Sequence, residues 1–306
     1  SGASEALAAL AAALGGAGIR LAVTPGTYPS FLAVARLAGQ DPLPWTGQEA
    51  VGAIVATNPS VPDGRRIDVA RFIEDARNVG AIPIVDEVYR QISLVGAVPE
   101  AAADLDPFAV SVGDLSKPLG LGGLRIGWIA TRNAEVRVAA ERWLGVFTGG
   151  PSVLSETVAL AALKTFDERV ARHTAEARAN APRVYAVLQE AGWTFGPAQL
   201  GLTVRAFPPR PVSEAAQRAL EAEGGFLVPG TSFDGGGGFR IGLLSPSAGL
   251  RDALRRLTPP PARNALVVLM RAPREGTGKS RLAGSLGAAA PHVLARAFVA
   301  DTLRMA

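Results

Sequence analysis

The chain has 306 residues, of which 48% are hydrophobic and 19% are charged, and its formal net charge is +4. This composition is typical of a folded protein with a large core, and the length is sufficient for two domains. The absence of cysteine excludes disulfides, cysteine-ligated metals and thiol catalysis. Only two histidines are present, His173 and His292, which disfavours a histidine metal cluster or a Ser-His-Asp triad.

Charge and hydropathy also narrow the choice of partners and location. The basic residues are scattered and nearly all arginine, without a basic stripe that alternates with aromatic residues, so we expect no nucleic-acid partner. The most apolar stretch, residues 6–19, is short for a membrane span. It also lacks the basic start and cleavage site of a secretion signal. We therefore expect a cytoplasmic protein with no membrane partner.

The first half of the chain alternates short apolar runs with helical segments. The Ala/Leu-rich residues 3–15 predict a helix that ends at Gly15-Gly16, and the periodicity of residues 67–79 predicts another. Apolar runs that predict strands cover residues 19–23, 51–56, 81–85, 108–112 and 124–130. This alternation predicts an α/β fold in which a mostly parallel sheet is flanked by helices.

The second half follows a different pattern. Long helical segments are predicted over residues 133–147 and 152–191, and a smaller α+β arrangement follows them. Its predicted strands cover residues 202–207, 225–228 and 238–243, and its helices cover 213–223 and 247–257. Three prolines at 259–261 predict a linker, and beyond it we expect a strand at 265–270, a Gly-rich loop and a helix. We thus predict a large domain over 1–150, a small domain over 151–258 and a partial α/β unit over 262–306.

Lys117 lies between a predicted buried strand and a glycine-rich loop. It is one of only three lysines in the chain, so a surface lysine on a turn is the less attractive interpretation. An amine at the end of a core strand can act as a nucleophile. Gly120, Gly122 and Gly123 would allow the backbone to approach a ligand closely, and Arg125 could bind an anion through two hydrogen bonds.

Four further positions have a structural interpretation, and two of them, Asp86 and Ser4, also suggest a binding site. Asp86 follows a buried strand, where open α/β sheets bind ligands, but an aspartate there can also cap a helix. Ser4 opens the first helix and could contact a phosphate at the helix N-terminus or simply cap the helix. Tyr28 after a Pro-Gly turn would by itself suggest a core residue, and Arg240 a surface arginine on a strand.

The string from Asp114 to Gly127 resembles the S-x-S-K…G-L-x-G-x-R-x-G motif of the class I/II aminotransferases, which bind pyridoxal 5'-phosphate. Asp86 to Tyr89 matches the D-E-x-Y motif of that family, and residues 58–64 resemble its N-P-x-N-P-x-G turn. The resemblance covers roughly residues 1–257 and implies a homodimeric transferase. It implies that Lys117 forms the Schiff base with the cofactor and moves the substrate's α-proton.

The resemblance also assigns the other candidate residues. It implies that Asp86 pairs with the pyridine nitrogen of the cofactor and that Tyr89, with Asn58 nearby, contacts its ring oxygen. Ala3, Ser4 and Arg125 would hold its phosphate, Tyr28 would stack on its ring, and Arg240 would bind the substrate's α-carboxylate. No metal is implied.

The chain departs from the pattern of the family at two positions and at its start. Val61 stands where relatives have the asparagine that holds the ring oxygen, and Asp114 stands where they often have a serine or threonine that contacts the phosphate. Relatives also carry a segment before the phosphate turn, so we expect an N-terminally truncated chain.

Three functions remain open at this point. The first is an aminotransferase that acts on an α-amino acid and a 2-oxo acid. The second is a pyridoxal-phosphate decarboxylase or lyase, because some decarboxylases of this fold have a motif similar to the sequence of residues 58–65. The third is a catalytically impaired fragment fused to the start of a transferase domain.

The tail suggests the third function. It contains a Gly-Lys-Ser triplet, but Pro273 stands where a phosphate-binding P-loop requires glycine. Residues 262–306 instead resemble the start of a glycosyltransferase or nucleotidyltransferase-like domain, in which Arg271, Lys279 and Arg281 would contact a nucleotide. A poorly ordered appendage is the alternative interpretation.

Overall fold

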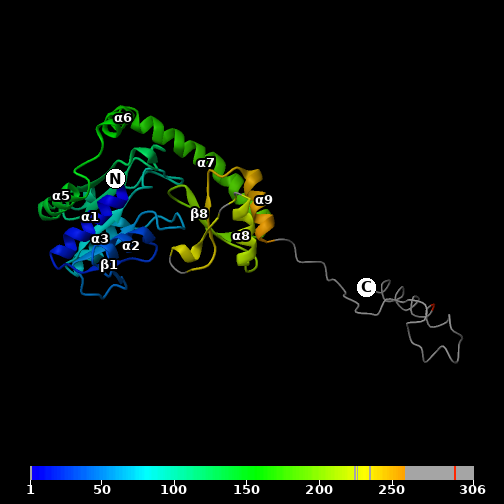
Figure 1. The fold of residues 1–306 in the computed structure, drawn as a ribbon, viewed down its shortest axis with the longest axis horizontal. Coiled ribbons are helices and arrows are strands. Elements are labelled where there is room, and N and C mark those ends of the chain that lie inside the picture. The colour runs from blue at the N-terminus through cyan, green and yellow to red at the C-terminus, as the bar shows by residue number, and fades with distance from the viewer. Residues whose placement is uncertain (1, 224, 226, 234–235, 259–292, 294–306) are drawn as a thin grey trace, which may run out of the picture. The chain divides into compact units, whose positions relative to one another are not determined.

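A computed structural model describes residues 2–223, 225, 227–233, 236–258 and 293 of the chain (Figure 1). Ser1–Thr258 form one compact unit. The prolines at 259–261 and the predicted strand, loop and helix after them lie outside the described residues. The resemblance of the tail to a glycosyltransferase or nucleotidyltransferase therefore stays a prediction.

The larger sheet of the compact unit is mostly parallel and flanked by helices, as predicted. Its strand order is β2-β1-β3-β4-β5-β6, and only β6 at the edge is antiparallel to its neighbour. The strands are β1 (Leu21–Val23), β2 (Leu43–Pro44), β3 (Ala53–Thr57), β4 (Ile82–Asp86), β5 (Val110–Asp114) and β6 (Gly127–Thr131).

The two faces of this sheet are covered by different helices. Alternate residues such as Val55 and Ile84 pack under α1 (Ala3–Gly16), α2 (Pro29–Leu37) and α5 (Ala134–Phe147). Their neighbours Ile54 and Val85 pack against α3 (Val69–Asn78) and α4 (Ala102–Leu105). Because successive side chains of a strand point to opposite faces, the unbroken apolar runs of β3 and β4 fill both layers.

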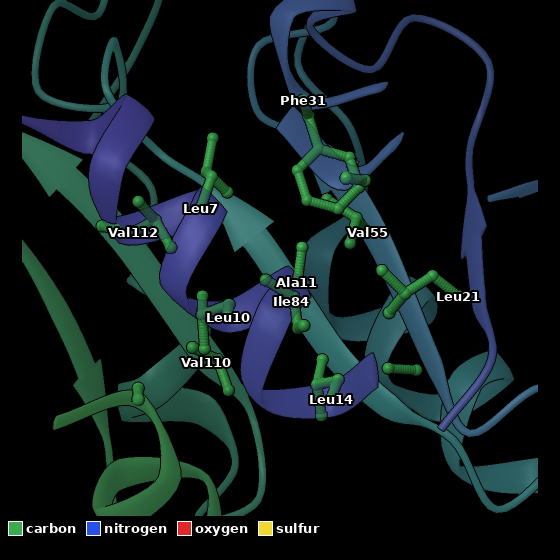
Figure 2. Packing of buried hydrophobic residues seen from close by; sticks show 14 of the residues in the cluster. Leu7, Leu10, Ala11, Leu14, Leu21, Phe31, Val55, Ile84, Val110 and Val112 are labelled. Atoms are coloured by element: carbon green, nitrogen blue, oxygen red, sulfur yellow. The ribbon is translucent and has the colours of Figure 1, made fainter. Parts of the chain in front are cut away.

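Helix α1 lies across the centre of one face of the sheet. Figure 2 shows Leu7, Leu10, Ala11 and Leu14 of this helix packed among side chains of the strands, including Val110 and Val112 of β5. Leu10 and Ala11 are almost fully buried. A helix that is apolar on most of its circumference belongs in a core, and that is where α1 lies.

Two consecutive helices occupy the segment for which one long helical stretch was predicted, residues 152–191. α6 (Val153–Leu163) and α7 (Phe166–Glu190) are separated at Lys164 and Thr165. Asp167 and Glu168 lie in the first turn of α7, where carboxylates interact favourably with the positive end of the helix dipole. In Figure 1, α7 runs from α6 to the region of the second sheet, and it packs against α9 (Ser247–Leu257).

The second sheet is small and antiparallel, with the strand order β7-β8-β10-β9. Val204, Ile241 and Leu243 of this region are buried with residues of α7, α9 and α8 (Glu214–Ala222). The strands are β7 (Thr194–Phe195), β8 (Thr203–Phe207), β9 (Val228–Pro229) and β10 (Phe239–Gly242).

A short segment before β8 ties the two sheets together. The amides of Gln199 and Leu200 both donate to the carbonyl of Gly64, with N···O distances of 2.7 and 3.0 Å. The amide of Gly201 donates to the carbonyl of Ile92 at 2.7 Å. Gly64 and Ile92 belong to the loops that follow β3 and β4. The second sheet is therefore anchored at the edge of the first sheet where these strands end.

Candidate active site

Three parallel strands end in polar side chains at one edge of the larger sheet. Thr57, Asp86 and Asp114 are the last residues of β3, β4 and β5, and Thr57 pairs with Asp86 in the sheet register. Parallel strands have their carboxyl ends at the same edge, and open α/β sheets bind ligands there. A cavity of about 370 Å³ lies at this edge, lined by all three residues.

Most of the residues that the sequence singled out line this one cavity, although they come from distant parts of the chain. From the larger sheet and its helices, Ala3, Ser4, Tyr28, Asp86 and Tyr89 line it. Lys117 and Arg125 do so from the glycine-rich loop, and Arg240 from the second sheet. Among the predicted site residues that the structure describes, only Asn58 does not line the cavity.

Asp86 lies at the floor of the cavity with only 5% of its surface exposed. Its Oδ1 accepts a hydrogen bond from the amide of Val88 at 3.2 Å. Burial raises the pKa of Asp86 to about 7, and the nearby carboxylates of Asp114 and Glu87 act in the same direction. The residue is thus an acceptor for which a cationic partner would offset the cost of burying a charge.

Tyr89 lies between Lys117 and the second sheet. The Nζ atom of Lys117 is 5.8 Å from the centre of the Tyr89 ring, within the range of a cation–π contact. Burial raises the pKa of the Tyr89 hydroxyl, while the positive charge of Arg240 opposes that rise. The backbone of Gly201 passes against the ring, and a Cβ atom there would lie 3.3 Å from it. The phenol therefore stays a neutral hydrogen-bonding group in the cavity wall.

The opposite end of the cavity is suited to an anion. Helix α1 begins beside Gly2 without a side-chain cap, so its first turn presents backbone N–H groups and a positive dipole end. The guanidinium of Arg125 lies against that turn, because a Cβ atom at Gly2 would be 2.8 Å from Arg125 Nη2. Arg125 Nη1 donates to the carbonyl of Gly122 at 3.1 Å, which fixes the side chain.

Gly127 explains why β6 and α1 can approach each other at this end. A Cβ atom at Gly127 would lie 2.5 Å from the carbonyl carbon of Gly2 and 2.7 Å from the amide nitrogen of Ala3. Only a residue without a side chain fits there. The first turn of α1 can therefore lie next to Arg125, two residues before Gly127.

Arg240 lies on β10, directly opposite Arg205 on β8. Arg205 is buried, with Nη1 3.7 Å from Asp63 Oδ1 and Nε donating to the carbonyl of Gly237 at 2.9 Å. Arg240 forms no ion pair with a carboxylate in the described part of the chain, and its Cζ atom lies 5.1 Å from the ring of Phe233. Like charges on opposed residues repel, so an anion bound in the cavity would stabilise Arg240.

Two residues that depart from the family pattern also line the cavity, and Asn58 lies behind it. Val61 is 8% exposed and offers the cavity an apolar surface. Asp114 is 6% exposed, and its Oδ1 accepts from the amide of Ser116 at 2.9 Å. Asn58 is fully buried, and its Oδ1 accepts from the amide of Ile67 at 3.2 Å. Asn58 thus holds its own loop.

Some of the lining residues received no role from the sequence. Thr57, Ser116, Gly201 and Thr203 all border the cavity. Thr57 and Ser116 lie next to predicted site residues, so the motifs themselves could have indicated them. The Oγ atom of Ser116 is buried without a hydrogen-bond partner. Gly201 and Thr203 lie at the cavity because the hydrogen bonds of residues 199–201 hold this segment against the first sheet. No sequence motif indicates these two residues.

Two features are absent from the described part of the chain. No helix in this part of the chain is long and apolar enough to cross a membrane. No group of three or more histidine, aspartate or glutamate residues within it could hold a metal ion.

Relatives with known structures share this architecture. The chain superposes on an aspartate aminotransferase double mutant from Thermus thermophilus with a TM-score of 0.73 and 21% identity, over 83% of this chain and 73% of that one. A probable N-succinyldiaminopimelate aminotransferase from the same species gives a TM-score of 0.71 and 25% identity, over 84% of this chain and 75% of that one.

Sequence comparison finds curated relatives as well. An aromatic amino acid aminotransferase of Mycobacterium sp. (strain KMS) is 32% identical over 151 residues, 48% of this chain and 41% of the relative. Capreomycidine synthase of Streptomyces vinaceus is 30% identical over 237 residues, 74% of this chain and 58% of that protein. The chain thus spans about two fifths of the length of the first of these relatives.

A family-wide comparison agrees with these similarities. The model of the family described as aminotransferase class I and II matches residues 1–257, which includes every described residue of the cavity. The chain therefore belongs to the class I and II aminotransferases.

Proposed function

We propose that the chain is a pyridoxal-phosphate-dependent aminotransferase that acts on an α-amino acid and a 2-oxo acid, with Lys117 as its Schiff-base lysine. The observation that supports this most directly is that Lys117, the buried Asp86 and two arginines, Arg125 and Arg240, line a single cavity. The family to which the chain belongs is generally dependent on this cofactor.

The cavity fits pyridoxal phosphate at both ends. Among the residues that the structure describes, the buried carboxylate of Asp86 has only a backbone amide as hydrogen-bond donor, and it suits the protonated nitrogen of the cofactor's ring. At the other end, the uncapped turn of α1, Arg125 and the unpartnered hydroxyl of Ser116 offer donors to a phosphate. Tyr28 and Tyr89 line the wall in between, where a flat ring would lie.

When bound, pyridoxal phosphate supplies a carbonyl carbon for amines and a ring that delocalises the electrons released at the substrate's α-carbon. The residues of the chain would bind and orient the substrate and control its protons. Arg240 binds the α-carboxylate through two hydrogen bonds and orients the substrate. Asp86 would accept a hydrogen bond from the ring nitrogen and so keep that nitrogen protonated. Lys117 Nζ would act as the base that removes the proton from the substrate's α-carbon.

We also propose that two copies of the chain form a homodimer. α5 and α6 expose large apolar side chains, among them Val146 (75%), Val153 (75%), Leu154 (80%) and Leu160 (64%). Several exposed large apolar side chains on two consecutive helices are unusual for a surface that faces only water, and such groups commonly mark a protein interface. The cytoplasmic location stays a prediction from the sequence.

An absorbance titration tests the cofactor proposal. Pyridoxal phosphate added to the purified protein is expected to give the absorbance band of a lysine-bound cofactor. Lys117→Ala should abolish the band, whereas Lys164→Ala, which removes an exposed lysine at the end of α6, should retain it. Absence of the band from the wild-type protein, or its persistence in Lys117→Ala, contradicts the proposal.

Product analysis tests the reaction type. The reconstituted protein is incubated with a panel of amino acids and a 2-oxo acid, and the products are separated. New 2-oxo acid matched by new amino acid supports amino transfer. An amine with carbon dioxide would instead identify a decarboxylase with the same cofactor.

A further inference from the structure

Helix α7 contacts the loop that carries Lys117 through a histidine. The Nδ1 atom of His173 lies 3.0 Å from the carbonyl oxygen of Pro118, the residue directly after Lys117. The imidazole ring also lies over Gly120, because a Cβ atom there would be 3.1 Å from His173 Cε1. The two contacts join residues that are separated by more than fifty positions in the sequence.

The chemistry of the contact fixes the proton on the ring. A backbone carbonyl can only accept a hydrogen bond, so Nδ1 must carry the hydrogen and donate it. Pro118 has a fixed φ angle, which leaves only its ψ angle to set the direction of its carbonyl. One hydrogen bond can therefore hold the backbone immediately after Lys117.

The same loop is also held by apolar contacts with α6 and α7. Leu115 and Leu119 are buried in a cluster with Ala159 and Ala162 of α6, and Phe166 and Val170 of α7 pack against this cluster. His173 follows Val170 by almost one helical turn, so it extends the same face of α7. Two leucines thus pack one part of the loop against α6 and α7, and a hydrogen bond from the imidazole holds another part.

We propose that His173 is a positioning residue that holds the Lys117 loop in place, so that Lys117 Nζ lies beside Tyr89 and faces the cavity. The consequence for cofactor binding rests on the proposed function, because it concerns the amine that would bond the cofactor. The effect on loop order does not, because it can be measured in the protein alone.

Three variants separate the hydrogen bond from the packing. His173→Phe keeps a ring over Gly120 but removes the donor. His173→Asn keeps a side-chain N–H donor close to the place of Nδ1 but removes the ring. Glu176→Ala changes an exposed residue nearly one turn further along α7 and serves as the matched control. If His173→Phe does not fold, His173→Leu removes the donor with a different shape.

Amide hydrogen exchange in the cofactor-free protein is the first measurement. We expect His173→Phe to accelerate exchange of the peptide covering residues 115–124 several-fold, up to about tenfold, which is the range for loss of one hydrogen bond. His173→Asn should restore most of the protection, and strand β3 should be unchanged in every variant. Wild-type exchange in His173→Phe, or equal acceleration in His173→Asn and His173→Phe, overturns the proposal.

The cofactor dissociation constant, from the absorbance titration, is the second measurement. It should rise several-fold in His173→Phe and return towards the wild-type value in His173→Asn, while Glu176→Ala stays at the wild-type value. If the wild-type protein does not bind the cofactor, the proposed function is contradicted. Hydrogen exchange then tests by itself whether His173 orders the Lys117 loop. Unchanged affinity in His173→Phe overturns the effect of His173 on binding.

Discussion

Asp86 holds its proton more tightly in the folded protein than in the unfolded chain, because burial penalises its charge and raises its pKa from 3.8 to about 7. Folding is therefore favoured by this group below pH about 4, where both states are protonated. The contribution is lost progressively as the pH rises through about 7. The difference between the two values corresponds to roughly 4 kcal/mol.

The first prediction follows from this linkage. Asp86→Asn should stabilise the cofactor-free protein at pH 8 by up to about 4 kcal/mol and have little effect at pH 4. Urea unfolding of both proteins across this range measures the difference. An asparagine variant that is less stable than the wild type at pH 8 would show that the carboxylate is stabilised by its surroundings.

The second prediction concerns Arg240. Arg240→Lys keeps the charge but loses the planar pair of donors, so it should raise the KM for the amino acid by about tenfold or more, with a smaller change in kcat. Arg251→Lys, on the exposed side of α9 and paired with Glu190, is the matched control. Steady-state kinetics measure both, and equal KM values in the two variants would remove Arg240 from substrate binding.

Most of the site residues predicted from the sequence line the cavity, because motif residues keep their local spacing on strands and turns. Asp86 is the last residue of β4, and Lys117 lies three residues after the end of β5. The roles of these residues remain proposals. Gly201 and His173 could not be predicted, since each acts through contacts with segments far away in the sequence, and nothing in the neighbouring residues encodes those contacts.

At the level of elements, α1 and β6 depend on each other through Gly127. Apolar periodicity predicted α1, β3 and β4 to within about two residues, because burial dominates their composition. No feature of the sequence indicated that β6 runs antiparallel to β5. It follows from the turn at residues 122–124 (Gly122–Leu124, a short 3₁₀ helix), after which Gly127 pairs with Asp114. Similarly, β2 and β7 have two residues each, too few for a pattern. The strand predicted over residues 225–228 was placed too early, since β9 begins only at Val228.

The third prediction is that Gly127→Ala displaces the first turn of α1. The added methyl group would meet the backbone of Gly2 and Ala3 at less than contact distance, so either the turn or β6 must shift. We expect a loss of about 1–3 kcal/mol in unfolding free energy, as for overpacking. Relative to the wild-type protein, the affinity for pyridoxal phosphate should fall more than the affinity for pyridoxal, which lacks the phosphate. Denaturant unfolding and absorbance titration measure the two effects.

A matched change tests whether the position matters. Gly123→Ala places a methyl group where no atom lies within 4 Å, in the same part of the chain. It should leave the phosphate preference intact. An equal loss of affinity for both forms of the cofactor in Gly127→Ala would mean that the turn does not hold the phosphate.

At the level of the whole molecule, the fourth prediction concerns the apolar surface of α5 and α6. Replacing Leu154 and Leu160 together by aspartate should convert a homodimer into monomers, because charged side chains oppose burial of this surface. Leu37→Asp, at an equally exposed leucine on α2 (89%), is the control. Sedimentation velocity at several concentrations measures the result. A monomeric wild-type protein would contradict the dimer.

The tie formed by Gln199, Leu200 and Gly201 has a mechanical consequence. If the second sheet rotates on the first, this tie is the pivot, since its amides are bonded to Gly64 and Ile92. Arg240 is level with Arg205, two residues along β8 from Thr203 and so about 7 Å further from the pivot. Counted from Gly201, Arg205 is four residues away, about 13 Å in an extended strand, so a rotation of about 10° moves the backbone of Arg240 by about 2 Å. A small rotation of the second sheet about this tie would therefore change the position of Arg240 in the cavity by no more than the length of its own side chain.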